Sequence, residues 1–374
     1  MGSKWKECEL GDFIELKRGY DLPKSTRNEG SIPIISSSGF TDFHDKPMVK
    51  GPGVVTGRYG TIGEVFYSEE DFWPLNTTLY VVDFKGNDPL FVYYLLQTIS
   101  YADYTDKAAV PGVNRNHLHK AKVKVPIYLD IQQKVAAQLY QLEKRVTLGK
   151  QINQTLEQMS QTLFKSWFVD FDPVIDNALD AGNPIPEALQ SRAELRQKVR
   201  SSADFKPLPA DIRALFPAEF EETELGWVPK DWYHKNAEEI ATISIGKTPP
   251  RNQKECFSHK KDSNYTWVSI KDLGNCNVFI KESSEYLTTD AVNNYNVKIV
   301  PKGAVLLSFK LTIGRIAIAE SILTTNEAIA HFYNMKHGVN KEYLYSYLQH
   351  FDYNTLGSTS SVSYTHLTLP TNSL

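Results

Sequence analysis

Two copies of one module lie along the chain, and this internal repeat narrows the possible folds more than any other feature. The matched motifs, in chain order, are Trp5 and Trp232, Gly19 and Gly246, the Thr-Ile-Gly triplets at 61–63 and 312–314, Asn76 and Asn326, and Tyr-rich stretches that end in Leu-Gln at 93–97 and 345–349. The offset between the copies grows from 227 to 251 residues, so the second copy carries an insert of about 24 residues. Two copies of roughly a hundred residues are too few and too large for a solenoid, and they predict a protein that reads two similar features at a set distance.

The composition is that of an ordinary globular protein of two or three domains, with 374 residues, 41% hydrophobic residues and 23% charged residues. Three cysteines without CxxC spacing cannot build a full disulfide framework, and they favour a reduced, cytoplasmic setting. No apolar run suits a signal peptide or a membrane span. The net charge of −3 argues against generic nucleic-acid binding, but it allows a binder whose basic residues cluster on one face.

Residues 1–126 have the pattern of a mixed α/β module built from short strands. Runs of β-branched and aromatic residues, separated by Gly, Asn, Ser and Pro, predict strands at 32–35, 54–55, 64–67 and 79–82. Residues 89–97 begin with proline and predict a helix. A second module of the same kind is expected over residues 230–360, so the predicted fold class is α+β.

A long helix is predicted over residues 127–172, which contain no proline and, at Gly149, a single glycine. Apolar residues step by 4, 3 and 4 on each side of Gly149, which is the spacing of a coiled-coil seam. At ~1.5 Å per residue the helix would be roughly 65 Å long. A core helix of a bundle is the less favoured alternative, because a helix of this length extends beyond the core of a single small domain. The predicted partner-binding seam consists of Val135, Leu139, Leu142, Val146, Ile152, Leu156, Met159 and Leu163.

The rest of the chain is less regular. Residues 173–229 contain seven prolines and many charges, so we expect a connecting segment with one or two short helices, such as Pro186–Arg200. The last stretch, 361–374, has no Lys, Arg, Asp or Glu and stands where the repeat predicts a second long helix. It is therefore predicted to be a non-native tail after an incomplete second module; a genuine short C-terminus is the alternative.

Two glycine-containing motifs resemble nucleotide-binding loops but fit other structures better. Residues 241–248 (ATISIGKT) match a relaxed phosphate-binding loop, yet two prolines follow where such a loop must open a helix, so a chance match is favoured. Residues 57–63 (GRYGTIG) lack the strand–helix context of a dinucleotide site and predict a strand–turn–strand. Arg58 and Tyr59 would lie on its exposed turn, where Arg58 is either solvated or reaches a phosphate or a guanine edge.

The stretch from Lys107 to Lys124 contains basic residues and no acid, which suits contacts with DNA phosphates. Lys122 and Lys124 alternate with valines, as on a protected edge strand. His117 and His119 are assigned ordinary surface roles, because a metal site would need further ligands. The hypothetical DNA contacts, chosen by residue type and turn position, are Lys17, Arg18, Ser37, Arg58, Tyr59, Asn114, Arg115 and Lys120 in the first module and Lys247, Arg251, Lys271 and Lys310 in the second.

The sequence shows none of the catalytic, cofactor-binding or metal-binding patterns sought: HExxH, GxSxG and the Asn/Asp-Pro-Pro-aromatic tetrad of amino-methyltransferases. This favours a binding or scaffold chain over an enzyme. Three functions compete. A DNA-specificity subunit is favoured by the duplicated module and the long helix. The alternatives are a coiled-coil protein-interaction scaffold without DNA recognition, and a nucleotide-dependent enzyme built on Lys247 and Thr248.

Several motifs give the chain a resemblance to the specificity subunits of type I restriction–modification systems. They are QTLFKSWFVDFDP at 161–173, LFPAEF at 215–220, ELGWVPKDW at 224–232, WVSIKDL at 267–273 and the two Thr-Ile-Gly turns. The resemblance covers about residues 5–360. The motif at the helix end and the Gly-Trp-x-Pro-x-x-Trp pattern are specific, and the Thr-Ile-Gly turns are moderately so.

The resemblance implies two target-recognition domains that each read one half of a split, asymmetric DNA site. It also implies methyltransferase subunits that bring S-adenosylmethionine, and a translocase–nuclease subunit that brings ATP and Mg²⁺, with no cofactor in this chain. Family members have two antiparallel spacer helices, whereas this sequence contains one. The seam would then seek another partner, such as the same helix of a second copy. The bases that are read do not follow from the sequence.

Overall fold

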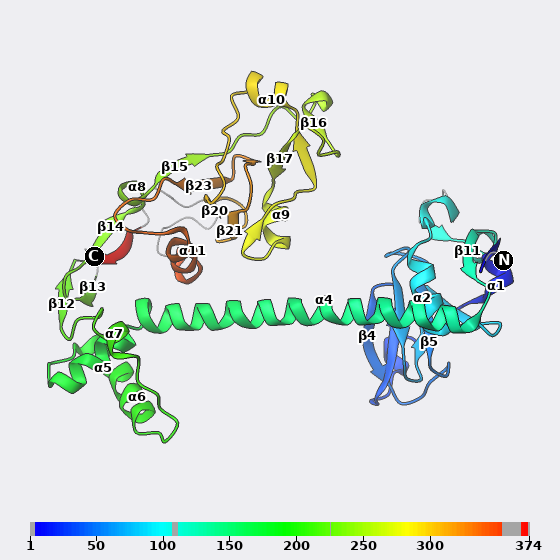
Figure 1. Ribbon diagram of the computed structural model, residues 1–374, viewed down its shortest axis with the longest axis horizontal. Coiled ribbons are helices and arrows are strands. Elements are labelled where there is room, and N and C mark those ends of the chain that lie inside the picture. Colours follow the sequence, from blue (N-terminus) through cyan, green and yellow to red (C-terminus); the bar gives the residue numbers. More distant parts are fainter. Residues whose placement is uncertain (1–3, 107–110, 225, 354–367, 373–374) are drawn as a thin grey trace. The chain divides into compact units, whose positions relative to one another are not determined.

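The computed structural model describes residues 4–106, 111–224, 226–353 and 368–372. The chain divides into two compact units, Met1–Asn153 and Gln154–Leu374, and each is described by itself. Each unit contains a module of short strands and small helices, and one long helix, α4 (Leu129–Phe164), belongs partly to each (Figure 1). The predicted α+β class, with two similar modules and a spacer helix, is confirmed. Among the described helices, none has both the length and the apolarity needed to cross a lipid bilayer.

The first module precedes α4 and is built from short elements. They are β1 (Trp5–Glu9), α1 (Leu10–Phe13), β2 (Glu15–Arg18), the 3-10 helix η1 (Lys24–Thr26), β3 (Ile32–Ser36), β4 (Gly39–His44), β5 (Gly53–Gly57), β6 (Val65–Ser68), β7 (Trp73–Pro74), β8 (Thr78–Asp83), α2 (Pro89–Gln97), the 3-10 helix η2 (Tyr101–Tyr104), β9 (Thr105–Asp106), β10 (Gly112–Val113), α3 (Arg115–Leu118) and β11 (Lys122–Pro126). The four predicted strands and the predicted helix at 89–97 are confirmed.

The central sheet of this module is antiparallel and has the strand order β2–β8–β5–β6. Buried side chains such as Leu16, Val54 and Leu79 face a core that also contains Leu96 of α2. A second sheet places β3 between β4, its antiparallel neighbour, and β7, its parallel neighbour. The α2 helix begins with a side-chain cap, because Asp88 accepts a hydrogen bond of 2.8 Å from the Phe91 N–H.

The first and last strands of the module pair with each other. β1 and β11 are antiparallel, with Trp5 opposite Pro126 and Glu9 opposite Lys122. Along β11 the valines are buried and the lysines exposed, which confirms the predicted alternation of an edge strand. Lys122 Nζ lies 2.9 Å from Glu9 Oε1. The chain therefore enters and leaves the module through one two-stranded ribbon.

The second module repeats this plan. Its elements are β14 (Trp232–Asn236), α8 (Ala237–Ile240), β15 (Thr242–Ile245), the 3-10 helix η5 (Lys254–Cys256), β16 (Phe257–Ser258), β17 (Tyr265–Val268), α9 (Ile270–Asn275), β18 (Phe279–Ile280), β19 (Glu285–Leu287), α10 (Thr289–Asn294), β20 (Val305–Ser308), β21 (Ile316–Ala319), β22 (Thr324–Thr325), β23 (Ile329–Tyr333), α11 (Lys341–His350) and β24 (Thr368–Asn372). The order β15–β23–β20–β21 matches β2–β8–β5–β6, and parallel β17 and β22 match β3 and β7. The predicted repeat is therefore structural as well as sequential.

The insert of the second module lies between β17 and β20. That interval contains α9, β18, β19 and α10, whereas the first module has only β4 between the equivalent strands β3 and β5. β18 extends the central sheet by pairing in parallel with β21, and β19 joins β16 and β17 in a separate sheet. The second module thus has additional surface beside a conserved plan of strands.

α4 ends earlier than the sequence predicts, at Phe164 rather than at residue 172. A π-helix, η3 (Lys165–Val169), follows, and Phe171 then adopts a left-handed conformation with φ of 54°. Phe168 lies against Trp232 with ring centroids 5.9 Å apart, and Phe171 contacts the same indole edge-on at 6.0 Å. The wider π turn changes the direction of successive side chains, so these aromatic rings meet in one buried cluster instead of following a straight helix.

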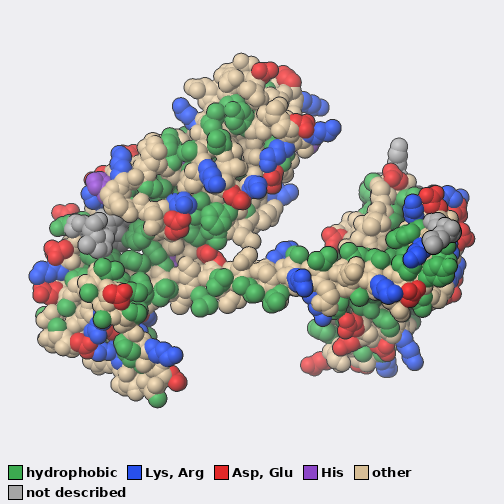
Figure 2. All heavy atoms as spheres, viewed as in Figure 1, with side chains coloured by type: hydrophobic (Ala, Val, Ile, Leu, Met, Phe, Trp, Pro, Cys, Tyr) green, Lys and Arg blue, Asp and Glu red, His purple; other side chains and the backbone are tan. Residues whose placement is uncertain are grey.

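Polar and apolar side chains of α4 have different surroundings. Two glutamates accept hydrogen bonds, because Tyr94 of α2 donates one of 2.6 Å to Glu143 and Tyr345 of α11 donates one of 3.2 Å to Glu157. The predicted seam from Leu139 to Leu163 is 37–62% exposed, and Figure 2 shows apolar side chains along the middle of α4. Val135 differs from the other seam residues, because it packs against the core of the first module. The seam therefore remains open on each unit.

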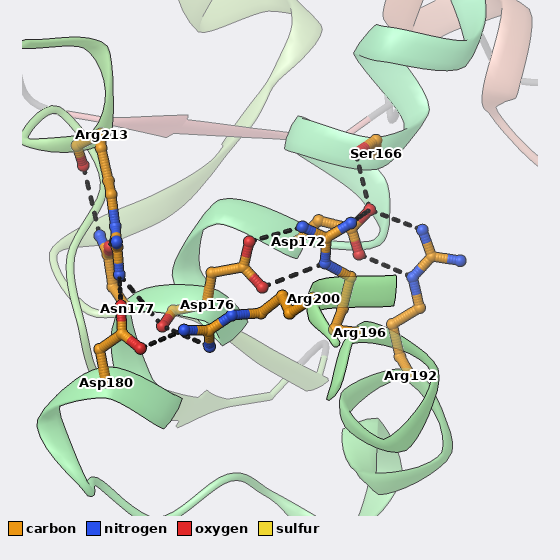
Figure 3. A network of polar contacts seen from close by, with 9 residues as sticks. All are labelled: Ser166, Asp172, Asp176, Asn177, Asp180, Arg192, Arg196, Arg200 and Arg213. Carbon is orange, nitrogen blue, oxygen red and sulfur yellow. Dashed lines mark hydrogen bonds and ion pairs between the residues drawn. The ribbon is translucent and has the colours of Figure 1, made fainter. Parts of the chain in front are cut away.

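Residues 172–229 contain the short helix predicted at Pro186–Arg200, and they are otherwise more ordered than the connecting segment that the sequence predicts. They form α5 (Asp172–Ala181), the 3-10 helix η4 (Glu187–Leu189), α6 (Gln190–Arg200), α7 (Ala210–Arg213) and a hairpin of β12 (Phe220–Thr223) and β13 (Gly226–Pro229). Figure 3 shows that ion pairs join α5 to α6: Asp172 with Arg192, Asp176 with Arg196, and Asp180 with Arg200. Partners are always 20 residues apart, so the two helices run parallel. The prolines at 184 and 186 lie in the segment that connects the end of α5 to the start of η4, where their fixed φ suits an extended chain.

The last described strand, β24, pairs antiparallel with β14 and so takes the place that β11 has beside β1. The predicted non-native tail covers residues 361–374. Of these, 361–367, 373 and 374 lie outside the described residues. The origin of the tail stays a prediction.

Candidate DNA interface

Three of the predicted contact residues of the first module are hydrogen-bonded to Thr77. The backbone N–H groups of Arg58 and Tyr59 donate to the Thr77 carbonyl at 2.9 and 3.2 Å. The Ser37 N–H donates to the Thr77 hydroxyl at 3.3 Å. The turn between β3 and β4 and the turn between β5 and β6 are therefore fixed side by side, although they are distant in sequence.

The glycine-rich turn after β5 presents Arg58 on the ring of Tyr59. The guanidinium carbon lies 4.5 Å from the ring centroid, which is the arrangement of a cation–π contact. A Cβ added at Gly112 would lie 2.2 Å from this ring, so glycine is required for the ring to occupy its place. Gly63 has a φ of 83°, and the predicted strand–turn–strand is confirmed. The stack restricts the guanidinium before any ligand binds, which lowers the entropic cost of binding.

The predicted contacts Lys17 and Arg18 lie on β2, an edge strand of the central sheet, and both side chains are exposed. The Gly19 N–H that follows them donates to the Thr78 carbonyl at 3.1 Å. The end of β2 therefore lies next to the Thr77 turn. The structure thus brings five of the eight contacts predicted for this module to one end of its central sheet.

The remaining three predicted contacts lie in or next to α3. A backbone hydrogen bond connects the residue before this segment to the turn that carries Arg58. The Val113 N–H donates to the Arg58 carbonyl at 3.0 Å. Asn114 caps α3 by accepting a hydrogen bond of 2.9 Å from the Asn116 N–H, so part of its side chain has a structural role. Arg115 and Lys120 are exposed on this helix and just after it.

His119 corrects one expectation from the sequence, because it is not an ordinary surface residue. Its Nε2 accepts a hydrogen bond of 3.0 Å from the Leu16 N–H, which ties α3 to β2. Burial, with a smaller contribution from the charge of Arg115, lowers the pKa of His119 below its usual value. The neutral ring is therefore the form that supports this contact.

In the second module, the segment from Thr325 to Ala328 takes the role of Thr77. The Phe309 N–H donates to the Ala328 carbonyl at 3.0 Å, which repeats the bond from Arg58 to Thr77. Lys310, the next residue, is exposed. The Lys247 N–H donates to the Thr325 carbonyl at 3.0 Å. Lys247 and Lys310 are thereby held beside the same short segment.

Residues 241–248 do not have the surroundings of a phosphate-binding loop. β15 ends at Ile245, and the next helical element is the three-residue η5, which begins at Lys254. A nucleotide site would need a helix that opens directly after Lys247. The local structure therefore does not support the hypothesis of a nucleotide-dependent enzyme built on Lys247 and Thr248.

The two remaining contacts predicted for the second module lie near Lys247 and along α9. Trp267 donates from Nε1 to the Lys247 carbonyl at 3.4 Å, and its ring lies 4.5 Å from the guanidinium carbon of Arg251. Lys271 is exposed in the first turn of α9. Arg315, which the sequence analysis did not select, donates to the Ile270 carbonyl at 2.7 Å and secures the start of α9.

His331 is a buried residue of the site that the sequence analysis also missed. Its Nδ1 lies 3.0 Å from Ser244 Oγ, and its Nε2 lies 2.7 Å from Thr325 Oγ1. Because the Thr325 hydroxyl donates to the Asn326 carbonyl, Nε2 carries the proton and Nδ1 accepts from Ser244. Tyr80 occupies the equivalent place of β8, opposite Lys17. No local sequence signal distinguishes such a histidine from a surface one.

We expect acid to destabilise the second module through His331. Burial lowers its pKa to about 4, so the unfolded state binds a proton first as the pH falls below the ordinary value near 6.5. The stability that the neutral ring provides is present above pH ~6.5 and is lost by pH ~4, which amounts to about 3 kcal/mol. Chemical unfolding between pH 7 and 4.5 measures this loss. His331→Gln should show a flatter profile, and an equal pH dependence in both proteins would contradict the assignment.

We expect Arg58→Ala to weaken DNA binding about tenfold, because a restricted guanidinium is lost from the turn. Lys50→Ala is the matched control, since this exposed lysine precedes β5 whereas Arg58 follows it. Fluorescence anisotropy with duplex DNA measures both affinities. Equal affinities for the Arg58 variant and the unaltered chain would remove Arg58 from the interface.

Comparisons with known proteins agree with the repeat. The family model described as the type I restriction modification DNA specificity domain matches residues 2–158 and 229–371. The chain is 28% identical over 366 residues to the type I restriction enzyme HindI specificity subunit of Haemophilus influenzae, covering 87% of this chain and 78% of that protein. It is 35% identical over 135 residues to the MjaIX specificity subunit of Methanocaldococcus jannaschii, covering 36% of this chain and 30% of that protein.

Solved structures of similar description also match. The type I restriction–modification S subunit from M. genitalium has 12% identity and a TM-score of 0.49, with 99% of this chain and 85% of that one covered. The HsdS subunit from Thermoanaerobacter tengcongensis has 11% identity and a TM-score of 0.32, with 100% and 86% covered.

Proposed function

The chain belongs to the family of type I restriction–modification DNA specificity subunits, and from this premise we propose that it directs adenine methylation and restriction to a split, asymmetric DNA site. Each module would read one half of the site. The observation that carries the proposal is the repeated turn, in which the bond from Arg58 to Thr77 and the bond from Phe309 to Ala328 hold cationic residues at equivalent ends of two sheets.

The different side chains at these equivalent places support an asymmetric target. Tyr59 of the first module corresponds to Lys310 of the second in this turn, and Tyr80 corresponds to His331 in the strand beneath it. Two modules with one backbone plan and different side chains at its end are expected to read different bases. A fixed separation between them would add affinity, because the second contact becomes intramolecular once the first has formed.

The chemistry is assigned to partners. Methyltransferase subunits would supply S-adenosylmethionine, and a translocase–nuclease subunit would supply ATP and Mg²⁺. This chain would contribute recognition and assembly without catalysis or a cofactor of its own. We propose a cytoplasmic location, because DNA is the ligand and the three free cysteines suit a reducing compartment.

Assembly is proposed to use the exposed seam of α4. Apolar side chains repeated at coiled-coil spacing cover a partner helix when one is present. The described residues contain one helix of this length, so the helix that covers the seam would come from a methyltransferase subunit or from α4 of a second copy. Self-association through two such helices is the second of these arrangements.

Methylation mapping tests the proposal. The chain is expressed with its neighbouring methyltransferase subunit in a host that lacks DNA methylation, and modified adenines are located by long-read sequencing. A split, asymmetric motif is the expected result. A symmetric motif would instead indicate two copies paired through α4. No methylated motif would contradict the proposed activity for the chain in this form.

A scaffold that binds proteins but not DNA is the second candidate, and the open seam of α4 favours it equally. The two differ in their response to salt. A DNA reader releases counterions from phosphates, so its affinity falls steeply as salt rises, whereas a pure scaffold has no such affinity.

A further inference from the structure

Arg251 of the second module is held between two aromatic rings and one carboxylate. Its guanidinium carbon lies 4.4 Å from the ring centroid of Phe257 and 4.5 Å from that of Trp267. The two rings meet edge to face, with centroids 5.7 Å apart. Trp267 is itself 2% exposed, so the guanidinium rests on a fixed support.

Glu285 binds Arg251 in a way that leaves one edge of the guanidinium available. Both carboxylate oxygens bond to the same nitrogen, Nη1, at 3.0 and 2.9 Å. Glu285 lies opposite Trp267 in the pairing of β19 with β17, so the sheet positions the acid and the aromatic support together. Among the contacts of the described residues, no other hydrogen bond of this guanidinium occurs, and its Nε and Nη2 edge carries donors for a bidentate ligand.

The carboxylate also changes which ligand this arginine suits. Glu285 cancels the charge of Arg251 and places a negative group beside it, which disfavours the approach of a DNA phosphate. A guanine edge is neutral and offers two acceptors, N7 and O6, at the spacing of an arginine fork. The side chain of Arg251 is 52% exposed, so the open edge is accessible.

We propose that Arg251 is the specificity-determining residue for one guanine of the second half-site, and that Glu285 is a positioning residue that directs it to the base and away from the phosphates. This inference rests on the proposed function and goes beyond it by naming a base and the pair that selects it. The neighbouring Lys247, whose carbonyl accepts from Trp267, places the pair beside the predicted interface.

The competing explanation is a clamp that only holds the segment from Lys247 to Cys256 on the sheet. A clamp predicts that loss of Arg251 lowers affinity for every DNA sequence in proportion to the loss of stability. A base reader predicts a change at one position of the preferred sequence. The two explanations therefore differ in the sequence that is bound, which can be measured independently of methylation.

The experiment selects bound duplexes from a random DNA library, using the full chain with its methyltransferase subunits. Arg251→Lys keeps the charge but loses the fork and the planar stack. We expect it to lose roughly ten- to hundredfold discrimination for guanine at one position, with the other positions unchanged. Thermal unfolding of the variant checks that the module is folded.

Glu285→Gln tests the positioning role. With its neutralising charge removed, Arg251 should bind phosphates, so non-specific affinity should rise and the slope of log K against log salt should steepen by about 0.9. Glu282→Gln is the matched control, because it removes the same charge from a different ion pair, that of Lys261 at 2.7 Å. It should leave the guanine preference intact.

The outcomes separate this inference from the proposed function. A preferred sequence that Arg251→Lys weakens uniformly, without relaxing one guanine, would overturn the assignment of Arg251 and leave the specificity role in place. An unchanged salt slope in Glu285→Gln would remove the positioning role. If the unaltered complex selects no preferred sequence, the proposed function fails, and the inference fails with it.

Discussion

Changing Leu156 and Met159 to glutamate will prevent assembly with methyltransferase subunits while the chain remains folded. The two side chains are 56% and 62% exposed, so their replacement disturbs little packing within the chain. Surface substitutions of this kind change the free energy of unfolding by about 0.5 kcal/mol or less. In the assembled complex the same positions would place two charges in a desolvated seam, and binding should fall about a hundredfold or more.

The matched control places the same charges on the opposite face of the helix. Gln154 and Gln158 are exposed and differ from the seam by about half a turn, so changing both to glutamate should leave assembly unaffected. Co-purification and sedimentation with the methyltransferase subunit measure assembly, and circular dichroism checks the fold. If the seam variant assembles as well as the control does, the seam is not the docking surface.

Changing Asp172 to alanine should destabilise the second unit by about 3 kcal/mol. Asp172 accepts hydrogen bonds from Ser166 at 2.6 Å and from two nitrogens of Arg192 at 2.7 and 2.6 Å. Its side chain is 5% exposed and that of Arg192 is 30% exposed, so the arginine left behind regains only part of its hydration. Breaking a buried pair by removing one partner costs about 3–5 kcal/mol, and the partial exposure favours the lower end.

The ladder between α5 and α6 supplies its own control. Exposure of the acidic side chain rises from 5% at Asp172 to 13% at Asp176 and 43% at Asp180. Replacement by alanine should therefore cost less in that order, with about 1 kcal/mol or less at Asp180. Urea unfolding followed by tryptophan fluorescence measures the series. Equal losses at all three positions would show that burial does not decide the strength of these pairs.

The features that could be predicted from the sequence are those with a regular period or a repeat. α4 follows from its apolar spacing and the absence of proline, and the second copy of the strands follows from the Thr-Ile-Gly triplets. The turn at 57–63 follows from its glycines. Each of these depends on residues near one another in the chain, or on a motif that occurs twice.

The features that were missed depend on contacts between distant residues. α5 was missed because the proline-rich segment 173–229 has the composition of a connection, whereas α6 lies within the helix that the sequence predicts at Pro186–Arg200. Arg251 was selected by type, but its partner Glu285 lies 34 residues away, at the start of β19. His331 is separated from Ser244 by 87 residues. Sequence spacing within one element cannot reveal such partners, because the fold of the whole module brings them together.

The ribbon formed by β1 and β11 brings the two ends of the first module together. Trp5 stands opposite Pro126, and α4 begins three residues after that strand ends. A different module with the same paired end strands could be exchanged there if it also accommodated Val135 and Glu143, which are among the residues of α4 that contact the first module. The proposed DNA contacts of the first module and the exposed part of the seam thus lie in separate stretches of the chain, so we expect that one can change while the other is preserved.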